Sequence, residues 1–285
     1  MTASFRQASA WAVAAFTGVV ASATESQPAA LPADPISASH MSGVRAEICR
    51  DHLFDPALAT ARLPTGYRLI PAEEVAKTDA PLAGLLRRQP DARRHAVGSL
   101  CLMAVEAFDI DGTPVIGPEP MPMAFWWAAA EGPRHPDMRG KARHVQLGSW
   151  YPRGTSHAGR ILRTDPMARF VDITVRQVEP GSWRLSLALP DETVTASVRA
   201  GSQSAPSKGG QPGAMSVPMS GESAAYFTVY SHVGHRHRPA EGRWRAAGAG
   251  VFAQAFAIPG EASAFATIFQ DGWTAQSGLY RFAPR

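Results

Sequence analysis

The sequence has few lysines and cysteines, and it lacks the short motifs that mark many common enzymes. Its 285 residues include three lysines against 25 arginines, and only two cysteines. There is no H-E-x-x-H, no G-x-S-x-G and no glycine-rich phosphate loop between a strand and a helix. These absences argue against a zincin, an α/β-hydrolase and a P-loop nucleotide-binding protein. The sequence therefore indicates a compartment, a fold class and candidate site residues, but no particular reaction.

The one pronounced apolar run lies near the N-terminus, from Ala8 to Val20, and only Arg6 precedes it as a charge. Its length is typical of a secretory signal peptide and falls short of the roughly 18 residues that cross a bilayer. Small residues follow at 21–23 and form a cleavage site. We therefore expect a signal peptide at 1–23 and a secreted or periplasmic protein with no stable membrane span after cleavage. A retained N-terminal anchor is the alternative.

Two further stretches are poor in large apolar residues. Residues 24–43 are rich in Pro, Ser and Ala, and such a composition cannot offset the entropy of ordering the chain. We expect a disordered leader there and a single β-rich domain over 44–285. The Gly/Ser/Pro-rich stretch 200–222 is expected to be a flexible insert, or else a lid in which Met215 and Met219 contact an apolar ligand.

Cys49 and Cys101 are the two cysteines. An exported chain meets an oxidising environment, so a disulfide between them is the first expectation. Two buried free thiols are one alternative. A catalytic cysteine is another, but neither residue has sequence neighbours that would stabilise a thiolate.

Helix signals come early and strand signals follow. Asp55 and Pro56 begin a first short helix, and two more are expected in "PAEEVAK" and "APLAGLLRRQ". From residue 98 onward apolar residues alternate with polar ones, with an Asp111-Gly112 turn and a hairpin across "EPGS". We expect a mainly β fold, an antiparallel β-barrel or a sandwich with a few short N-terminal helices.

Positive charge is concentrated in two segments. Residues 131–163 carry a net charge of +5 and residues 236–245 carry +3, whereas the whole chain carries +4. This distribution favours basic surfaces that attract an anion, although arginine-rich loops also serve solubility. Nucleic acid is not an expected partner, because the basic segments lack interleaved aromatic residues.

Large aromatic side chains near arginines are the candidate ligand-binding residues. Trp150 and Tyr151 beside Arg153 suit a ligand with an apolar body and an anionic end. Arg238 and Trp244 would hold an anionic group and offer a face for stacking. Core packing is the alternative for the aromatic residues. The full candidate set is Trp127, Trp150, Tyr151, Arg153, Arg238 and Trp244.

The stretch "SHVGHRHRP" places His232, His235 and His237 within six residues. If the strand continues through it, His235 and His237 share a face, which is the arrangement that lets two imidazoles bind one metal. Zinc is therefore a possible cofactor, with Glu241 or a distant histidine such as His144 or His157 as a further ligand. The alternatives are an anion-binding role and a solvated hairpin tip.

The segment "FDPALATARLPTGYRLIP", from Phe54 to Pro71, resembles the opening of acetoacetate-decarboxylase-like proteins. The resemblance implies a double-layered β-barrel or cone around an apolar pocket for a small carboxylic or keto compound. That family's chemistry requires a lysine activated for Schiff-base formation. Lys77, Lys141 and Lys208 lie in a segment expected to be helical, a basic loop and the flexible insert, so the resemblance does not extend to a catalytic lysine.

These observations favour an exported β-barrel-like protein that binds a small, partly apolar molecule in an internal pocket. The ligand is either neutral or anionic. One alternative is a metal-assisted hydrolase or lyase that uses the histidine cluster. Another is a structural envelope protein without a small ligand. Whether the protein is an enzyme stays open at this point.

Overall fold

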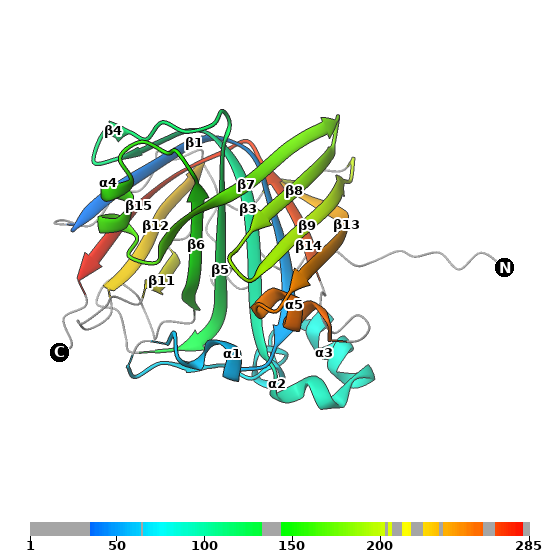
Figure 1. The fold of residues 1–285 in the computed structure, drawn as a ribbon. Helices are drawn as coiled ribbons and strands as arrows, with labels where there is room; N and C mark the ends of the chain where they lie inside the picture. Colours follow the sequence, from blue (N-terminus) through cyan, green and yellow to red (C-terminus); the bar gives the residue numbers. More distant parts are fainter. Residues whose placement is uncertain are drawn as a thin grey trace.

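The chain is mainly β, with one large mixed sheet (Figure 1). The signal peptide expected at 1–23 and the leader up to residue 34 lie outside the residues that the computed structural model describes. Among the described residues, no helix is long and apolar enough to cross a membrane. The backbone alone is described for 205–206, 213–217, 225–233, 237, 266–270 and 281. The described residues are 35–63, 65–132, 144–202, 205–206, 213–217, 225–233, 236–258 and 266–281.

Four long strands form a central sheet. They are β1 (Ser37–Phe54), β3 (Ala96–Ile110), β5 (Met121–Glu131) and β6 (His144–Pro152), and each pairs antiparallel with the next. Because side chains alternate along a strand, this sheet has two faces with different surroundings. β1 and β6 form its two edges, and both edges continue into further strands.

One flank joins the two edges through five strands. It consists of β7 (Ala168–Glu179), β8 (Ser182–Ala188), β9 (Glu192–Ala200), β13 (Arg236–Gly248) and β14 (Ala266–Asp271), paired in that order. β7 pairs in parallel with the end of β6, and β14 pairs with the second half of β1. Figure 1 shows β7 crossing in front of the central strands. The β7–β8 hairpin expected from the alternating pattern is confirmed.

A second flank joins the first half of β1 to the start of β6. It consists of β11 (Gly213–Val217), β12 (Ala225–Val233) and β15 (Trp273–Arg281). β11 meets the start of β6, and β15 pairs with the first half of β1. β11 and the short β10 (Ala205–Pro206) lie inside the stretch 200–222 for which a flexible insert is expected. Backbone pairing with β12 and β13 does not need apolar side chains. This explains why the composition of the stretch did not predict β10 and β11.

β1 begins at Ser37, inside the segment expected to be a leader that ends at residue 43. The side chains here are small and polar, but they are paired. The Ser39 hydroxyl lies 2.8 Å from that of Ser277 on β15, and the Ser37 hydroxyl lies 2.9 Å from that of Thr164. These hydrogen bonds, one to β15 and one to α4 (Ala158–Thr164), stabilise the start of β1 although it has few large apolar side chains.

The expected N-terminal helices are present as α1 (Ala57–Thr60), α2 (Ala72–Val75) and α3 (Ala80–Arg88). Asp79 caps α3, because its carboxylate accepts a hydrogen bond of 2.9 Å from the Leu82 backbone N–H. A 3₁₀ helix follows α3, and the short β2 pairs with β5. Their bounds are Pro90–Arg94 for the 3₁₀ helix and Arg68–Leu69 for β2.

Three remaining short elements complete the fold. The tight turn at Asp111-Gly112, with φ of 51° and 70°, joins β3 to β4 (Thr113–Pro114) as the sequence predicted. α4 (Ala158–Thr164) follows β6, and α5 (Val251–Phe256) follows β13.

The two faces of the central sheet differ in what covers them. The core face, which includes Ile48, Leu102 and Trp126, packs in one buried cluster with Ile173 and Leu185 of β7 and β8. The opposite side, which we call the inner face, carries Cys49 and Cys101 among other residues. The core face thus supplies a large part of the hydrophobic stabilisation, whereas the inner face combines polar side chains with a second buried apolar cluster that includes Met103, Val105 and Met123.

The disulfide predicted from the sequence is confirmed. Cys49 and Cys101 lie directly opposite each other on β1 and β3, and their sulfur atoms are 2.03 Å apart. The bond therefore joins two neighbouring strands in the middle of the central sheet. A disulfide also fits an oxidising compartment.

Candidate functional site

The candidate site forms where β1 changes its neighbour. Up to Val44, β1 pairs with β15; from Glu47 onward it pairs with β14. The register with β3 shifts between Val44 and Ala46, which marks a β-bulge. Gly272, with φ of 69°, separates β14 from β15, and its N–H donates to the Val44 carbonyl at 2.8 Å. The two flanks therefore diverge from the central sheet at this point.

Gly43 is required at the bulge for two reasons. Its φ of 63° lies in the left-handed region that side chains disfavour. A Cβ atom there would also stand only 2.4 Å from a carboxylate oxygen of Glu106 on β3. Glycine thus lets the Glu106 side chain lie against the β1 backbone.

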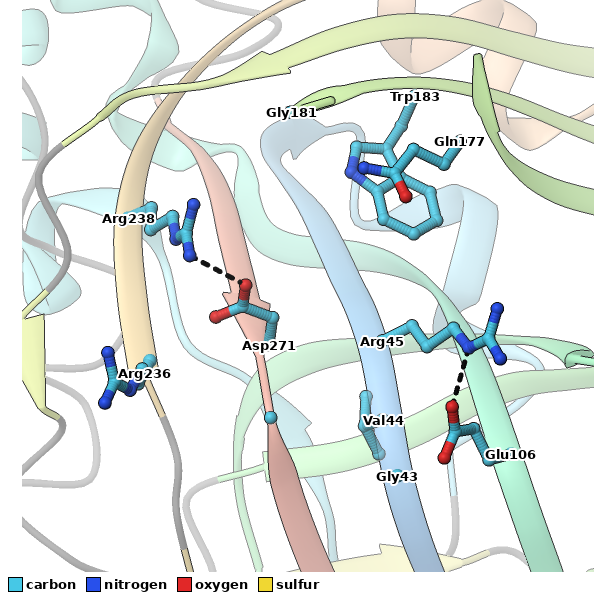
Figure 2. A pocket seen from close by; sticks show the side chains of 11 residues that line it. Gly43, Val44, Arg45, Glu106, Gln177, Gly181, Trp183, Arg236, Arg238 and Asp271 are labelled. Atoms are coloured by element: carbon cyan, nitrogen blue, oxygen red, sulfur yellow. Dashed lines mark hydrogen bonds and ion pairs between the residues drawn. The ribbon is translucent and has the colours of Figure 1, made fainter. Parts of the chain in front are cut away.

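The divergence leaves a cleft of about 710 Å³, which we call the arginine cleft (Figure 2). This volume is within the range of about 300–1,000 Å³ that is usual for small-molecule sites. Figure 2 shows Arg236 and Arg238 on one side, with Arg45 on the other side and Trp183 above. The full lining is Gly43, Val44, Arg45, Glu106, Gln177, Gly181, Trp183, Arg236, Arg238, Asp271 and Gly272.

Three guanidinium groups and two carboxylates line the cleft, so its described lining has a net positive charge. The Arg238 guanidinium contacts the Asp271 carboxylate at 3.1 Å, and that pair is partly buried. The Arg45 Nε lies 2.8 Å from a Glu106 oxygen, but both side chains are more than half exposed. An exposed pair of this kind contributes only about 0–1 kcal/mol. Arg45 can therefore exchange Glu106 for an anionic ligand at little cost.

Asp271 adds a hydrogen-bond acceptor to this positive lining. Its Oδ2 contacts Arg238, whereas its buried Oδ1 accepts no hydrogen bond from the described residues. In the β13–β14 register Asp271 stands directly opposite Arg236. The cleft thus offers positive groups with an acceptor beside them, and the indole of Trp183 as an apolar wall.

The structure places Arg238 in the cleft but does not bring the other candidate ligand-binding residues there. Trp150 is buried in the core face cluster, and Tyr151 lies on the inner face. Arg153 is exposed and pairs with Asp172 at 3.4 Å. The reason is the alternation of side chains in β6, which sends neighbours in sequence to opposite faces.

The other two candidate aromatic residues also lie apart. Trp127 is half-buried on the inner face, with its ring edge-on to His144 at 5.0 Å between centroids. Trp244 on β13 is half-buried against the core face cluster. Neither lines the arginine cleft.

The histidine cluster lies largely outside what the structure describes. His235 is not among the described residues, and His232 and His237 are described only as backbone of β12 and β13. Zinc binding by these residues stays a prediction. In the described part of the chain, the one group with metal-ligand spacing is Glu47, Cys49 and Cys101. Its two sulfur atoms are bonded to each other, so they do not provide thiolate ligands.

Two carboxyl groups lie on the inner face beside the disulfide. Burial raises the pKa of Glu47 to about 7, and burial likewise raises the pKa of Asp51 to about 7. A hydrogen bond from Ser99 lowers the pKa of Asp51, but the desolvation effect is larger. Both groups therefore titrate near neutral pH.

Sequence reasoning missed most of the cleft. Arg45, Glu106 and Asp271 stand in unremarkable strand patterns, and Trp183 belongs to the buried face of the β7–β8 hairpin. Only the bulge in β1 and the kink at Gly272 bring them together. The glycines at these points were the available signal, but glycine alone does not say which strands meet.

No family model matches the sequence, and no curated protein matches it. Two solved structures of acetoacetate decarboxylase are similar to this chain. The one from Legionella pneumophila shares 9% identity with a TM-score of 0.48, over 98% of this chain and 96% of that one. The second shares 9% identity with a TM-score of 0.43, over 87% and 88%. These structures belong to the same family as the resemblance noted at Phe54 to Pro71, and nothing about activity follows from the likeness.

Proposed function

We propose that this protein binds a small, partly apolar anion in the arginine cleft. The observation that carries the proposal is the convergence of Arg45, Arg236 and Arg238 around one space of about 710 Å³ beside Trp183. Guanidinium groups bind carboxylate or phosphate through paired hydrogen bonds, and the indole supplies an apolar contact. Asp271 favours a ligand with a hydrogen-bond donor next to its anionic group.

Export and a barrel-like closure of the sheet belong to the same proposal. The apolar run at the N-terminus supports export, and the disulfide is compatible with it. The pairing of β11 with both β6 and β12 supports closure over the inner face. Decarboxylation through a lysine is not proposed: Lys77 is exposed after α2, and the other two lysines lie outside the described residues.

The test is a calorimetric titration with benzoate and phenyl phosphate, beside benzyl alcohol as the uncharged counterpart. The anions should bind, and benzyl alcohol should bind more weakly, because the guanidinium groups recognise the charge. Arg238→Gln removes a charge-assisted contact and should weaken anion binding by about tenfold or more. Arg45→Gln, which changes an exposed side chain, should act in the same direction.

Arg184→Gln is the matched control, since Arg184 is exposed on β8 away from the cleft lining. Circular dichroism of each variant would verify that it is folded. If neither anion binds the wild type, or if the Arg184 variant loses as much affinity as the two cleft variants, the cleft is not the anion site.

A further inference from the structure

A second, smaller cavity lies on the inner face, away from the arginine cleft. It has a volume of about 50 Å³ and lies between β1, β3, β5, β6, β15 and α4. Its lining includes apolar side chains, among them Ile110, Met123 and Ile161. The polar lining residues are Ser39, Gln146, Tyr151, Thr164, Asp165 and Ser277.

Asp165 is the charged group of this cavity, and it is buried. The Gln146 Nε2 donates to both of its oxygens, at 3.2 and 3.3 Å. The Tyr151 hydroxyl donates to Oδ2 at 3.3 Å, and the Met167 backbone N–H donates to Oδ1 at 3.2 Å. These bonds hold the carboxyl group in place in the lining of the cavity.

The partners of Asp165 among the described residues are neutral donors. A buried carboxylate without a positive partner is costly, because its charge has lost water and gained no counter-charge. Burial accordingly raises the pKa of Asp165 above its usual range. A positively charged ligand in the cavity would supply the missing counter-charge.

Aromatic rings provide a second contact for a cation. The ring centroid of Tyr151 lies 6.3 Å from that of Phe108, with the two rings stacked. It lies 6.1 Å from the centroid of Phe125, with the rings edge-on. All three rings line the cavity. Ring faces attract cations, and the attraction is stronger where water is excluded.

From this combination we propose that the inner cavity binds a small primary alkylammonium ion. The ammonium group has three N–H donors, and the polar lining residues offer the Asp165 carboxylate, the Gln146 amide oxygen and the hydroxyls of Ser39 and Ser277 as acceptors. The alkyl group lies against Met123 and the aromatic rings. The volume limits the ligand to a few non-hydrogen atoms, in the size class of methylammonium or ethylammonium.

The experiment compares four salts at equal concentration and ionic strength: methylammonium, ethylammonium, tetramethylammonium and sodium chloride. Thermal unfolding and calorimetry of the intact protein are the measurements. Methylammonium and ethylammonium should raise the midpoint of unfolding, because they bind the native state alone. Tetramethylammonium has no N–H donor and is too large, so it should behave as sodium does. Binding should strengthen as the pH rises through the pKa of Asp165.

Two variants test the residue assignment. Asp165→Asn should weaken methylammonium binding by about tenfold or more, whereas Asp172→Asn, at an exposed carboxylate, should not. Arg238→Gln should bind methylammonium as the wild type does. The proposal of a cation site in the inner cavity can therefore fail independently of the proposal that the arginine cleft binds an anion. If Asp165→Asn does not fold, the comparison of salts on the wild type still decides. An equal response to sodium or tetramethylammonium, or no response to methylammonium, overturns the proposal.

Discussion

The carboxyl group of Asp51 should make the stability of the protein depend on pH in a defined way. Burial raises its pKa from 3.8 to about 7, against the smaller effect of the hydrogen bond from Ser99. The native state therefore holds this proton more tightly than the unfolded chain does. The free energy of unfolding must then fall as the pH rises from about 4 to about 7, and level off above that.

The magnitude follows from the shift. Each pKa unit corresponds to about 1.4 kcal/mol, so between pH 5 and pH 8 the wild type should lose about 3 kcal/mol through this group. Asp51→Asn keeps the shape of the side chain and removes the titration. The free energy of unfolding of the variant minus that of the wild type should therefore be about 3 kcal/mol larger at pH 8 than at pH 5. Glu47 titrates in both proteins, so its contribution largely cancels.

The assay is urea unfolding of both proteins at pH 5 and pH 8, with the disulfide intact and with midpoints and slopes compared. Asp172→Asn serves as the control, because its carboxylate is exposed and its ion pair with Arg153 is at the surface. A stability difference between Asp51→Asn and the wild type that is the same at both pH values would refute the reasoning. It would mean that Asp51 is not desolvated in the native state.

Two other changes have definite expected outcomes. Replacing Cys49 and Cys101 together by alanine removes a cross-link between residues 52 positions apart, which should lower the free energy of unfolding by about 4 kcal/mol on the chain-entropy model. Reduction of the wild type should have a similar effect. An unchanged urea midpoint would contradict this expectation. If the histidine stretch binds zinc, elemental analysis should find near-stoichiometric metal that disappears in the His235→Ala/His237→Ala double variant. Metal-free protein in both cases, with the variant folded, would remove the metal-assisted alternative.

The parts of the fold that the sequence predicted are those set by local patterns. The alternation of Val171, Ile173 and Val175 gives one buried face whatever lies opposite, so the β7–β8 hairpin follows from a short window. The Asp111-Gly112 turn is likewise decided by a few neighbouring residues. The start of β1 was missed because pairing of small polar residues leaves no periodic apolar signal.

The candidate sites depend on contacts that local patterns do not encode. Arg238 was predicted as a ligand-binding residue. Asp271 and Arg45 line the same cleft only because of the bulge in β1 and the strand break at Gly272. Trp150 and Tyr151 were expected to act together, and strand alternation separates them. Asp165 carried no sequence signal, since the side chains that donate to it, Gln146 and Tyr151, come from β6.

The change of neighbours along β1 also has a consequence for how the molecule opens. The first half of β1 exchanges backbone hydrogen bonds with β15 and the second half with β14, so each flank can detach while the other stays paired. The disulfide at Cys49 holds β1 to β3 throughout, whichever flank moves. Local unfolding of the native protein should therefore proceed in two independent units that share one strand, each exposing its own binding space to solvent.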